Sequence, residues 1–151
     1  MNRIADYLFA ICIALWVGAL WTIGFVALVL FKQLAADHVL AGALATRLFN
    51  DLSWFGIGCA SYALIFLFAR EGLRAMKTAV FWCVLVMLLF TLAGHFGVQP
   101  IMARLQAEAL PREVMQSLLR NRFAAWHGVS SVLYLIESML GIVLVTQTFR
   151  R

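Results

Sequence analysis

Charged residues are scarce in this sequence, and their scarcity excludes a soluble globular domain. Aspartate, glutamate, lysine and arginine make up 13% of the 151 residues, whereas hydrophobic residues make up 64% and the mean hydropathy is +0.93. Soluble domains average about 25% charged and about half apolar residues. The composition therefore indicates an integral membrane protein, whose partner is the lipid bilayer around it. The net charge of +5 requires no nucleic-acid partner, because basic residues at the ends of membrane spans face anionic lipid head groups.

The sequence motifs of common enzymes and metal sites are also missing. No nucleophile stands beside a base, no glycine-rich phosphate loop occurs, and there is no HExxH or CxxC pattern. Cys12, Cys59 and Cys83 stand singly within apolar segments, where we expect them to be small packing residues. The sequence offers no catalytic residue, argues against a hydrolase or a nucleotide-driven pump, and leaves the question of enzyme activity open.

Four apolar blocks predict an all-α fold, an integral membrane bundle of four transmembrane helices. The blocks place the spans at about residues 7–31, 52–70, 77–103 and 120–149. About 20 residues of helix cross the hydrocarbon core, and a helix satisfies its own backbone hydrogen bonds there. The first block is too long for a signal peptide and lacks a cleavage site, so we expect it to be retained. No linker or repeat divides the chain, which predicts a single domain over residues 1–151.

The two longer connections are predicted to contain helix as well. In residues 37–51 a leucine recurs at every fourth position after Asp37, a candidate N-cap, which is typical of a short helix lying at the membrane interface. Pro111 suits the first turn of a helix that could run unbroken into the fourth span. Small residues inside the spans are expected to allow close helix packing, namely Gly18, Gly24, Gly56, Gly58 and Gly141.

The placement of basic residues favours a cytoplasmic position for both termini. The 12 lysines and arginines divide equally between the two sides of the predicted bundle. Arg70, Arg74 and Lys77 are concentrated in one short connection, whereas those of the opposite side are spread over two longer ones. Positive charge in short loops marks the cytoplasmic side of a membrane. The 70–77 connection, and the termini that share its side, are therefore assigned to the cytoplasm.

Polar residues interrupt the third span at helical spacing. At about 100° per residue, Thr91, Gln99 and Met102 fall on the same helix face as His95. A polar face does not point into lipid, so this one is expected to face the bundle interior or another subunit. Pro100 has no N–H group, which predicts a bend that opens a small cavity beside His95, His127 and Gln99.

A second polar face runs along the fourth span. Ser131, Tyr134 and Ser138 fall on the face of His127, with Glu137 at its edge and near the middle of the span. A charged carboxylate at that depth is costly, so we expect Glu137 to be protonated or paired. Two interpretations remain open for this acid. It either hydrogen-bonds a neighbouring helix, with Thr22, Ser61 and Tyr62 as candidate partners, or carries a function.

His95 and His127 are predicted to approach one another across the third and fourth spans. Both lie in the half of the membrane next to residues 104–122, at depths that differ by about 6 Å. Gln99 is expected to line the same pocket. The pair is interpreted either as a satisfied interhelical contact or as a ligand site, and Tyr134 and Glu137 are further candidates for lining a cofactor there.

Three stretches carry a resemblance to a known family: LWVGALWTIGF in the first span, TLAGHFGVQPIM in the third and FAAWHGVSSVLYLI at the start of the fourth. Together they resemble the bacterial membrane family called domain of unknown function 4149, related to eukaryotic transmembrane protein 205. The resemblance covers nearly the whole chain and implies a four-helix protein of the bacterial inner membrane without an assigned activity. The eukaryotic relative's link to platinum-drug resistance hints at metal handling. In layout the chain is also similar to four-span haem and copper proteins of the protoporphyrinogen oxidase and copper-resistance type, but it lacks their histidine near the start of the first span.

Three functions follow as alternatives. The first is an accessory or assembly subunit whose polar faces contact other membrane subunits or a second copy of the chain. The second is a protein that binds or transports a metal ion such as copper through His95 and His127, with Met102 as a soft ligand. The third is a haem protein with the two histidines as axial ligands. Neither haem nor copper is required by the sequence.

Overall fold

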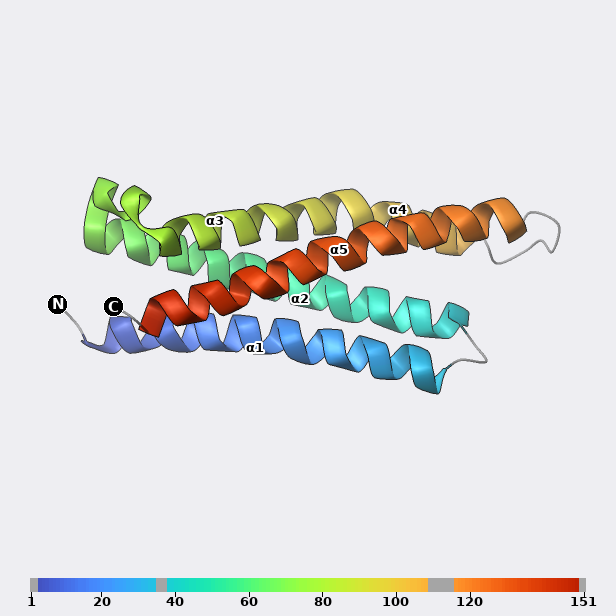
Figure 1. The fold of residues 1–151 in the computed structure, drawn as a ribbon, viewed down its shortest axis with the longest axis horizontal. Helices are drawn as coiled ribbons and strands as arrows, with labels where there is room; N and C mark the ends of the chain where they lie inside the picture. The colour runs from blue at the N-terminus through green and yellow to red at the C-terminus, as the bar shows by residue number, and fades with distance from the viewer. Residues whose placement is uncertain (1–2, 35–37, 109–115, 150–151) are drawn as a thin grey trace.

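The structure, a computed structural model, describes residues 3–34, 38–108 and 116–149. These residues form four long helical stretches, two of which lie within 38–108. The side chains of a few helix residues, His127 among them, lie outside this description. In chain order the elements are α1 (Arg3–Gln33), α2 (His38–Glu71), the 3-10 turn η1 (Gly72–Lys77), α3 (Ala79–Leu92), the π-helix η2 (Ala93–Val98), α4 (Gln99–Glu108) and α5 (Gln116–Phe149) (Figure 1). No strand occurs in these ranges.

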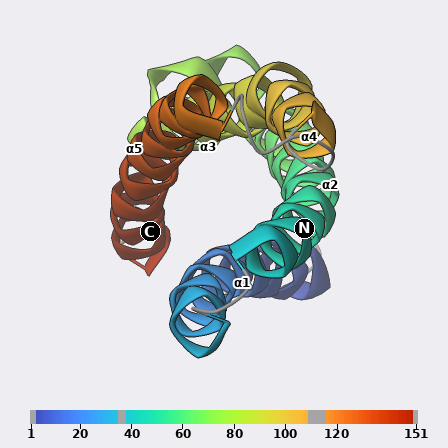
Figure 2. The same cartoon turned by 90° about the vertical axis from the view of Figure 1, so that its right-hand side faces the viewer.

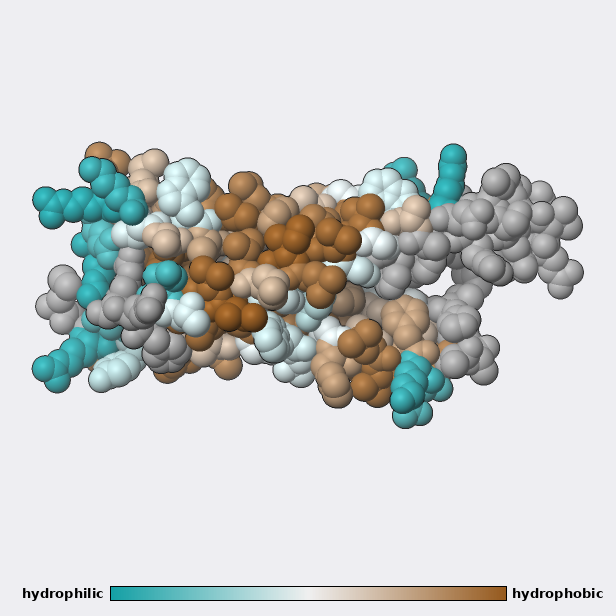
Figure 3. All heavy atoms as spheres, in the orientation of Figure 1, coloured by the Kyte–Doolittle hydropathy of each residue, from teal (hydrophilic) through white to brown (hydrophobic). Residues whose placement is uncertain are grey.

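Four stretches are long and apolar enough to cross a membrane: Arg3–Gln33, Leu40–Lys77, Ala79–Leu105 and Gly128–Thr148. The predicted all-α fold with four spanning helices is therefore confirmed. The space-filling view agrees with this assignment, because hydrophobic residues cover the middle of the visible face and hydrophilic residues lie near its two ends (Figure 3).

The helices follow one another around a common axis in the order α1, α2, α3 with α4, and α5 (Figure 2). α5 crosses the bundle obliquely. Its C-terminal end lies beside α1, whereas its start near Gln116 lies far from α1 (Figures 1 and 2). The ring of helices is consequently closed at the end that holds both chain termini and splayed between α1 and α5 at the other end.

The hydrophobic core occupies the closed half of the bundle. Its members come from α1, α2, η1, α3 and α5 and are Phe9, Ile13, Trp16, Cys59, Ala60, Ala63, Leu67, Ala75, Val80, Phe81, Val84, Met87 and Leu144. Cys12 donates a long thiol contact of 3.8 Å to the Cys59 carbonyl oxygen. An ion pair between Asp6 and Arg70 links α1 to α2 on the surface of this half. The core residues fill this half of the bundle, whereas the cavity described below lies in the other half.

The segment 37–51 is helical where it is described, but the predicted separate interfacial helix is wrong. α2 runs without a break from His38 to Glu71. Leu40 and Leu44 are 46% and 40% exposed on its outer face, whereas Ala41 and Ala45 are buried. In a membrane the greasy side chains can face lipid while small residues allow helices to approach. The leucine stripe therefore marks the lipid side of a long helix.

A tight turn joins α2 to α3. Gly72 has a φ of +57°, a left-handed conformation that is sterically costly for residues with a Cβ. The 3-10 turn η1 follows, and Thr78 then caps α3 by accepting a hydrogen bond from the backbone N–H of Phe81 at 3.4 Å. Together these residues reverse the chain within the basic 70–77 connection.

The third span contains a π-helix directly before Pro100. Over Ala93–Val98 the helix widens, and the Gln99 backbone N–H donates to the Gly94 carbonyl five residues earlier. The sequence predicts a disturbance here because proline removes one helical hydrogen bond. The structure accommodates it by a π-turn, which inserts one extra residue and changes which side chains share a face. Pro111 lies outside the described residues, and α5 is described from Gln116.

Candidate functional site

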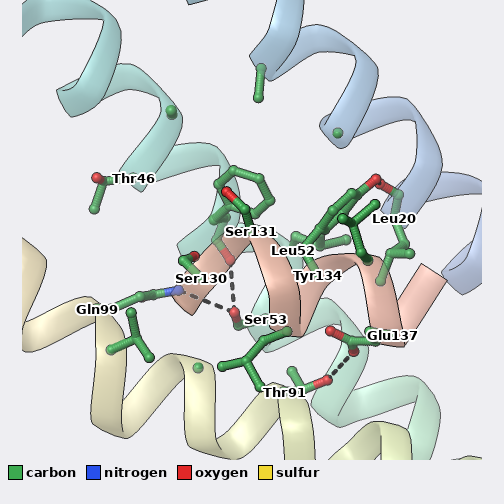
Figure 4. Close-up of a pocket in the computed structure, with 18 of the residues that line it drawn as sticks. Leu20, Thr46, Leu52, Ser53, Thr91, Gln99, Ser130, Ser131, Tyr134 and Glu137 are labelled. Atoms are coloured by element: carbon green, nitrogen blue, oxygen red, sulfur yellow. Dashed lines mark hydrogen bonds between the residues drawn. The ribbon is translucent and has the colours of Figure 1, made fainter. Parts of the chain in front are cut away.

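A cavity of about 470 Å³ lies between the helices in the splayed half of the bundle, and we call it the central cavity. Helices α1, α2, α3, α4 and α5 all contribute to its wall, which is mainly apolar. Its polar side chains are Thr46, Ser53, Thr91, Gln99, Ser130, Ser131, Tyr134 and Glu137 (Figure 4). An apolar cavity of this size with a few converging polar groups is typical of sites for small molecules.

The central cavity opens sideways between α1 and α5. Phe25 and Leu28 of α1 and Leu135 of α5 line it, yet they are 69%, 73% and 60% exposed. A side chain that both lines a cavity and faces outward lies at its mouth. This mouth coincides with the separation of α1 from α5 (Figure 2). In a membrane it would face the acyl chains of the bilayer.

Glu137 faces the central cavity and meets α3. A hydrogen bond joins its Oε1 to Thr91 Oγ1 at 2.5 Å (Figure 4). Thr91 Oγ1 also lies 2.9 Å from the Met87 carbonyl oxygen. The prediction that Glu137 pairs with a neighbouring helix is confirmed, but the named partners are wrong. Thr22, for example, is exposed and donates to the Gly18 carbonyl of its own helix.

A second polar contact joins α4 to α2. Gln99 Nε2 donates to Ser53 Oγ at 3.2 Å, and Ser53 Oγ donates to the Phe49 carbonyl at 2.7 Å (Figure 4). The hydroxyl of Ser53 is thus used in both directions. The cavity wall therefore carries two polar contacts with no shared partner, one at Glu137 and Thr91 and one at Gln99 and Ser53.

Tyr134 connects α5 to α1. Its hydroxyl donates to the Leu20 carbonyl at 2.9 Å, and its ring packs edge-on against Phe49 with centroids 5.8 Å apart. Gly24 provides the space for this side chain, since a Cβ built there would lie 1.8 Å from Tyr134 Oη. The predicted close packing is also found at Gly56, against Trp16, and at Gly141, against Val17. At Gly18 and Gly58 a Cβ would meet nothing within 4 Å, so close packing is absent there.

His95 does not line the central cavity. It lies in a second, outer groove between α2 and α4. The groove is lined by Ala43, Thr46, Arg47, Asn50, His95, Phe96, Gln99, Pro100 and Ala103. The imidazole packs edge-on against Trp54, with ring centroids 4.9 Å apart. Its Nδ1 atom is buried and has no hydrogen-bond partner among the described residues. Gln99 lines both this groove and the central cavity.

Two of the predicted metal ligands, His95 and Met102, lie in different sites. Met102 is 8% exposed and lines the central cavity, whereas His95 lines the outer groove. His95 lies within the π-helix η2, where each residue turns the chain by less than the usual 100°, so its side chain does not share the face of Met102. The side chain of His127 lies outside the described part of the structure, so its approach to His95 stays a prediction. Among the described residues, no three His, Cys, Asp or Glu side chains gather as a metal site would require.

Two polar residues of the cavity, Thr46 and Ser53, were not singled out by the sequence analysis. They are seven positions apart, which places them on one face of α2 because seven residues make nearly two helical turns. Leu40 and Leu44 dominated the pattern of this segment instead. A search for polar spacing within apolar helices would have identified the two hydroxyl groups.

Comparison with known proteins places the chain in a family without adding an activity. No curated protein and no solved structure matches it. One family model does match, over residues 11–111, which include every wall of the central cavity except α5. Within that range α2 carries Ser53, α3 carries Thr91 and α4 carries Gln99. The chain therefore belongs to the family described as Domain of unknown function (DUF4149).

Proposed function

We propose that this chain is a membrane protein that binds an amphipathic small molecule in its central cavity. The observation that carries the proposal is an apolar cavity of about 470 Å³ that combines a sideways mouth with polar side chains on its wall. A ligand dissolved in the bilayer would enter between α1 and α5 past Phe25, Leu28 and Leu135. Its apolar part would lie against the cavity wall, and its polar group would meet Glu137 or the Gln99 amide.

The test is binding of a neutral aromatic probe, triphenylphosphine oxide, to the purified chain in nonionic detergent. Equilibrium dialysis with empty micelles as the reference gives the protein-dependent part. Ala45 is buried on the cavity wall, so Ala45→Phe should fill the space and lower the affinity at least about tenfold. Ala69→Phe, on an exposed position of the same helix outside the cavity lining, is the matched control and should bind as the wild type does. Equal binding by both variants would contradict the proposal.

An accessory or assembly subunit is the second candidate, and the outer face of α1 favours it. Ala14, Gly18 and Thr22 recur at every fourth position and are exposed. A Cβ at Gly18 would meet nothing within 4 Å, so another membrane helix could approach closely there. Cross-linking in native membranes should join α1 to a second copy or to another subunit. Gly18→Leu should abolish the product, while Gly58→Leu, at the exposed open glycine of α2, should leave it unchanged.

The metal or haem alternative rests on His95 and His127. Its support is the Nδ1 atom of His95, which has no hydrogen-bond partner among the described residues. Met102 lines the central cavity and His95 lines the outer groove, so this alternative does not use Met102 as a third ligand. An absorption spectrum and a metal analysis of the purified protein test it directly. His95→Ala should remove any haem band or bound copper, whereas Met102→Leu should leave both.

We also propose that residues 1–151 form one domain of the bacterial inner membrane with both termini in the cytoplasm. The supports are the continuous ring of packed helices and the concentration of Arg70, Arg74 and Lys77 in one short connection.

A further inference from the structure

We infer that the central cavity selects a lipophilic cation, which binds beside Glu137 in exchange for one proton. This inference deepens the proposed function and rests on it, since it specifies the class of molecule that the cavity takes. It draws on the charges of the lining residues, the hydrogen-bond geometry of Glu137 and the aromatic content of the wall.

The charges of the cavity wall are one-sided. Among the side chains that the structure describes, Glu137 is the one acidic residue in the lining, and none of the others is a lysine, arginine or histidine. Tyr134 is the other titratable group in this described lining, and its hydroxyl is engaged with the Leu20 carbonyl. The described residues of α1, α2, α3 and α4 contribute no charged side chain to the wall. A carboxylate formed here would have no cation among the described side chains to balance it, which makes a positively charged ligand the complementary one.

The hydrogen bonds of Thr91 indicate where the proton of Glu137 is held. Thr91 Oγ1 lies 2.9 Å from the Met87 carbonyl and 2.5 Å from Glu137 Oε1. A hydroxyl group has one proton to donate. Both contacts are hydrogen bonds at once when Thr91 donates to Met87 and the Glu137 carboxyl group donates to Thr91. A cation that arrives beside Glu137 takes the place of this proton, so the net charge of the cavity is unchanged.

Aromatic rings give the cavity a second preference for cations. Six rings line it: Trp16, Phe25, Phe31, Phe49, Phe90 and Tyr134. The face of an aromatic ring carries partial negative charge and attracts cations, most strongly where water is excluded. An apolar cation with a delocalised or shielded charge satisfies both the rings and the acid, and it partitions into the bilayer from which the mouth opens.

The experiment compares three probes of related shape on the full chain in nonionic detergent. Tetraphenylphosphonium is a cation, tetraphenylborate has the same shape with the opposite charge, and triphenylphosphine oxide is neutral. Equilibrium dialysis against empty micelles should show that the phosphonium binds at least about tenfold more tightly than the borate. Its affinity should rise with pH, by up to about tenfold per pH unit, because binding releases a proton. Wild-type protein alone suffices for both measurements.

The variant Glu137→Gln isolates the acid, since the amide can still donate to Thr91. It should lower phosphonium affinity at least about tenfold, remove the pH dependence and leave triphenylphosphine oxide binding unchanged. Asp51→Asn, the same carboxyl-to-amide change at an exposed position outside the cavity lining, should bind all three probes as the wild type does.

The outcomes separate the two proposals. Binding of the neutral probe with no preference for the phosphonium over the borate overturns the cation inference and leaves the cavity's binding function standing. Failure of all three probes to bind overturns both. A phosphonium affinity that is independent of pH overturns the proton exchange.

Discussion

Among the described glycines, Gly24 is the one whose replacement should lower the unfolding free energy most. Gly24→Ala would put a Cβ 1.8 Å from Tyr134 Oη and 2.3 Å from the adjoining ring carbon. The tyrosine would have to leave its place between α1 and α5 and lose its hydrogen bond to the Leu20 carbonyl. Overpacking of this kind costs about 1–3 kcal/mol of unfolding free energy. Reversible unfolding in mixed micelles measures the loss.

The matched control is Gly18→Ala in the same helix, where a Cβ meets nothing within 4 Å. It should change the unfolding free energy by less than about 0.5 kcal/mol in either direction. Combining Gly24→Ala with Tyr134→Leu should recover part of the loss, since the smaller side chain leaves the space free. Equal costs for the two glycine substitutions would contradict the assigned fit.

The hydroxyl group of Thr91 should contribute to stability through its contact with Glu137. Thr91→Val removes the hydroxyl that contacts Glu137 while nearly keeping the volume, and the carboxyl group is left without its partner. We expect a loss of about 1–2 kcal/mol, because an unsatisfied polar group inside a protein is costly. Thr91→Ser keeps the hydroxyl and should lose less than about half of that. Unfolding in mixed micelles again gives the values.

A double-mutant cycle separates this contact from packing effects. In a Glu137→Leu background the cost of Thr91→Val should fall by about 0.5–2 kcal/mol, the usual coupling between residues in contact. An unchanged cost in that background would mean that Thr91 acts through Met87 and the packing of α3 alone.

Among the elements, the π-helix η2 determines which side chains of the third span face the cavity. Deleting Gly97 would remove the extra residue and allow a regular α-helix, in which the residues after the deletion face the same way as before, because a π-turn takes up one inserted residue. Met102, which is 8% exposed, should therefore stay buried and Ala103 should stay exposed. In a chain whose cysteines are replaced by alanine, Ala103→Cys should react with a membrane-permeant maleimide at the same rate with and without Gly97.

The control for this experiment is Leu89→Cys, which is 56% exposed and precedes η2. Its labelling rate should also be the same with and without Gly97, because it precedes the deletion. Slower labelling at position 103 alone would show that the π-turn persists after the deletion and that the later residues turn by about 100°.

For the whole molecule, four spans place both termini on one side of the membrane. The chain ends lie at the same end of the bundle (Figure 1), next to the basic 70–77 connection. Fusions of a fluorescent protein that matures only in the cytoplasm should therefore fluoresce at either terminus. Alkaline phosphatase, which is active only outside the cytoplasm, should be inactive at both. Opposite results for the two termini would contradict a four-span topology, and inactive fluorescent protein at both would reverse the orientation.

The sequence by itself determined the class of the protein, the four spans and the polar faces of the last two helices. These features depend on local properties: the length of an apolar block is set against the thickness of the bilayer, and rotation around one helix follows from residue spacing. That is why Thr91 and Glu137 could both be identified as inward-facing before their contact was known. The prediction of a separate interfacial helix at 37–51 was wrong because leucines at every fourth position mark an apolar helix face without showing where it lies. Here that face points outward from a long spanning helix.

Only the tertiary structure decided which helices are neighbours and how they cross. The pairing of Glu137 with Thr91 depends on the depth at which α5 meets α3, and residue spacing within one helix carries no information about another. The central cavity exists because α5 diverges from α1 over half its length, a crossing angle that arises from packing along the whole interface. The separation of His95 from Met102 follows from the π-helix η2, since the residues within it turn the chain by less than 100° each, whereas Thr91 before it and Met102 after it line the same cavity.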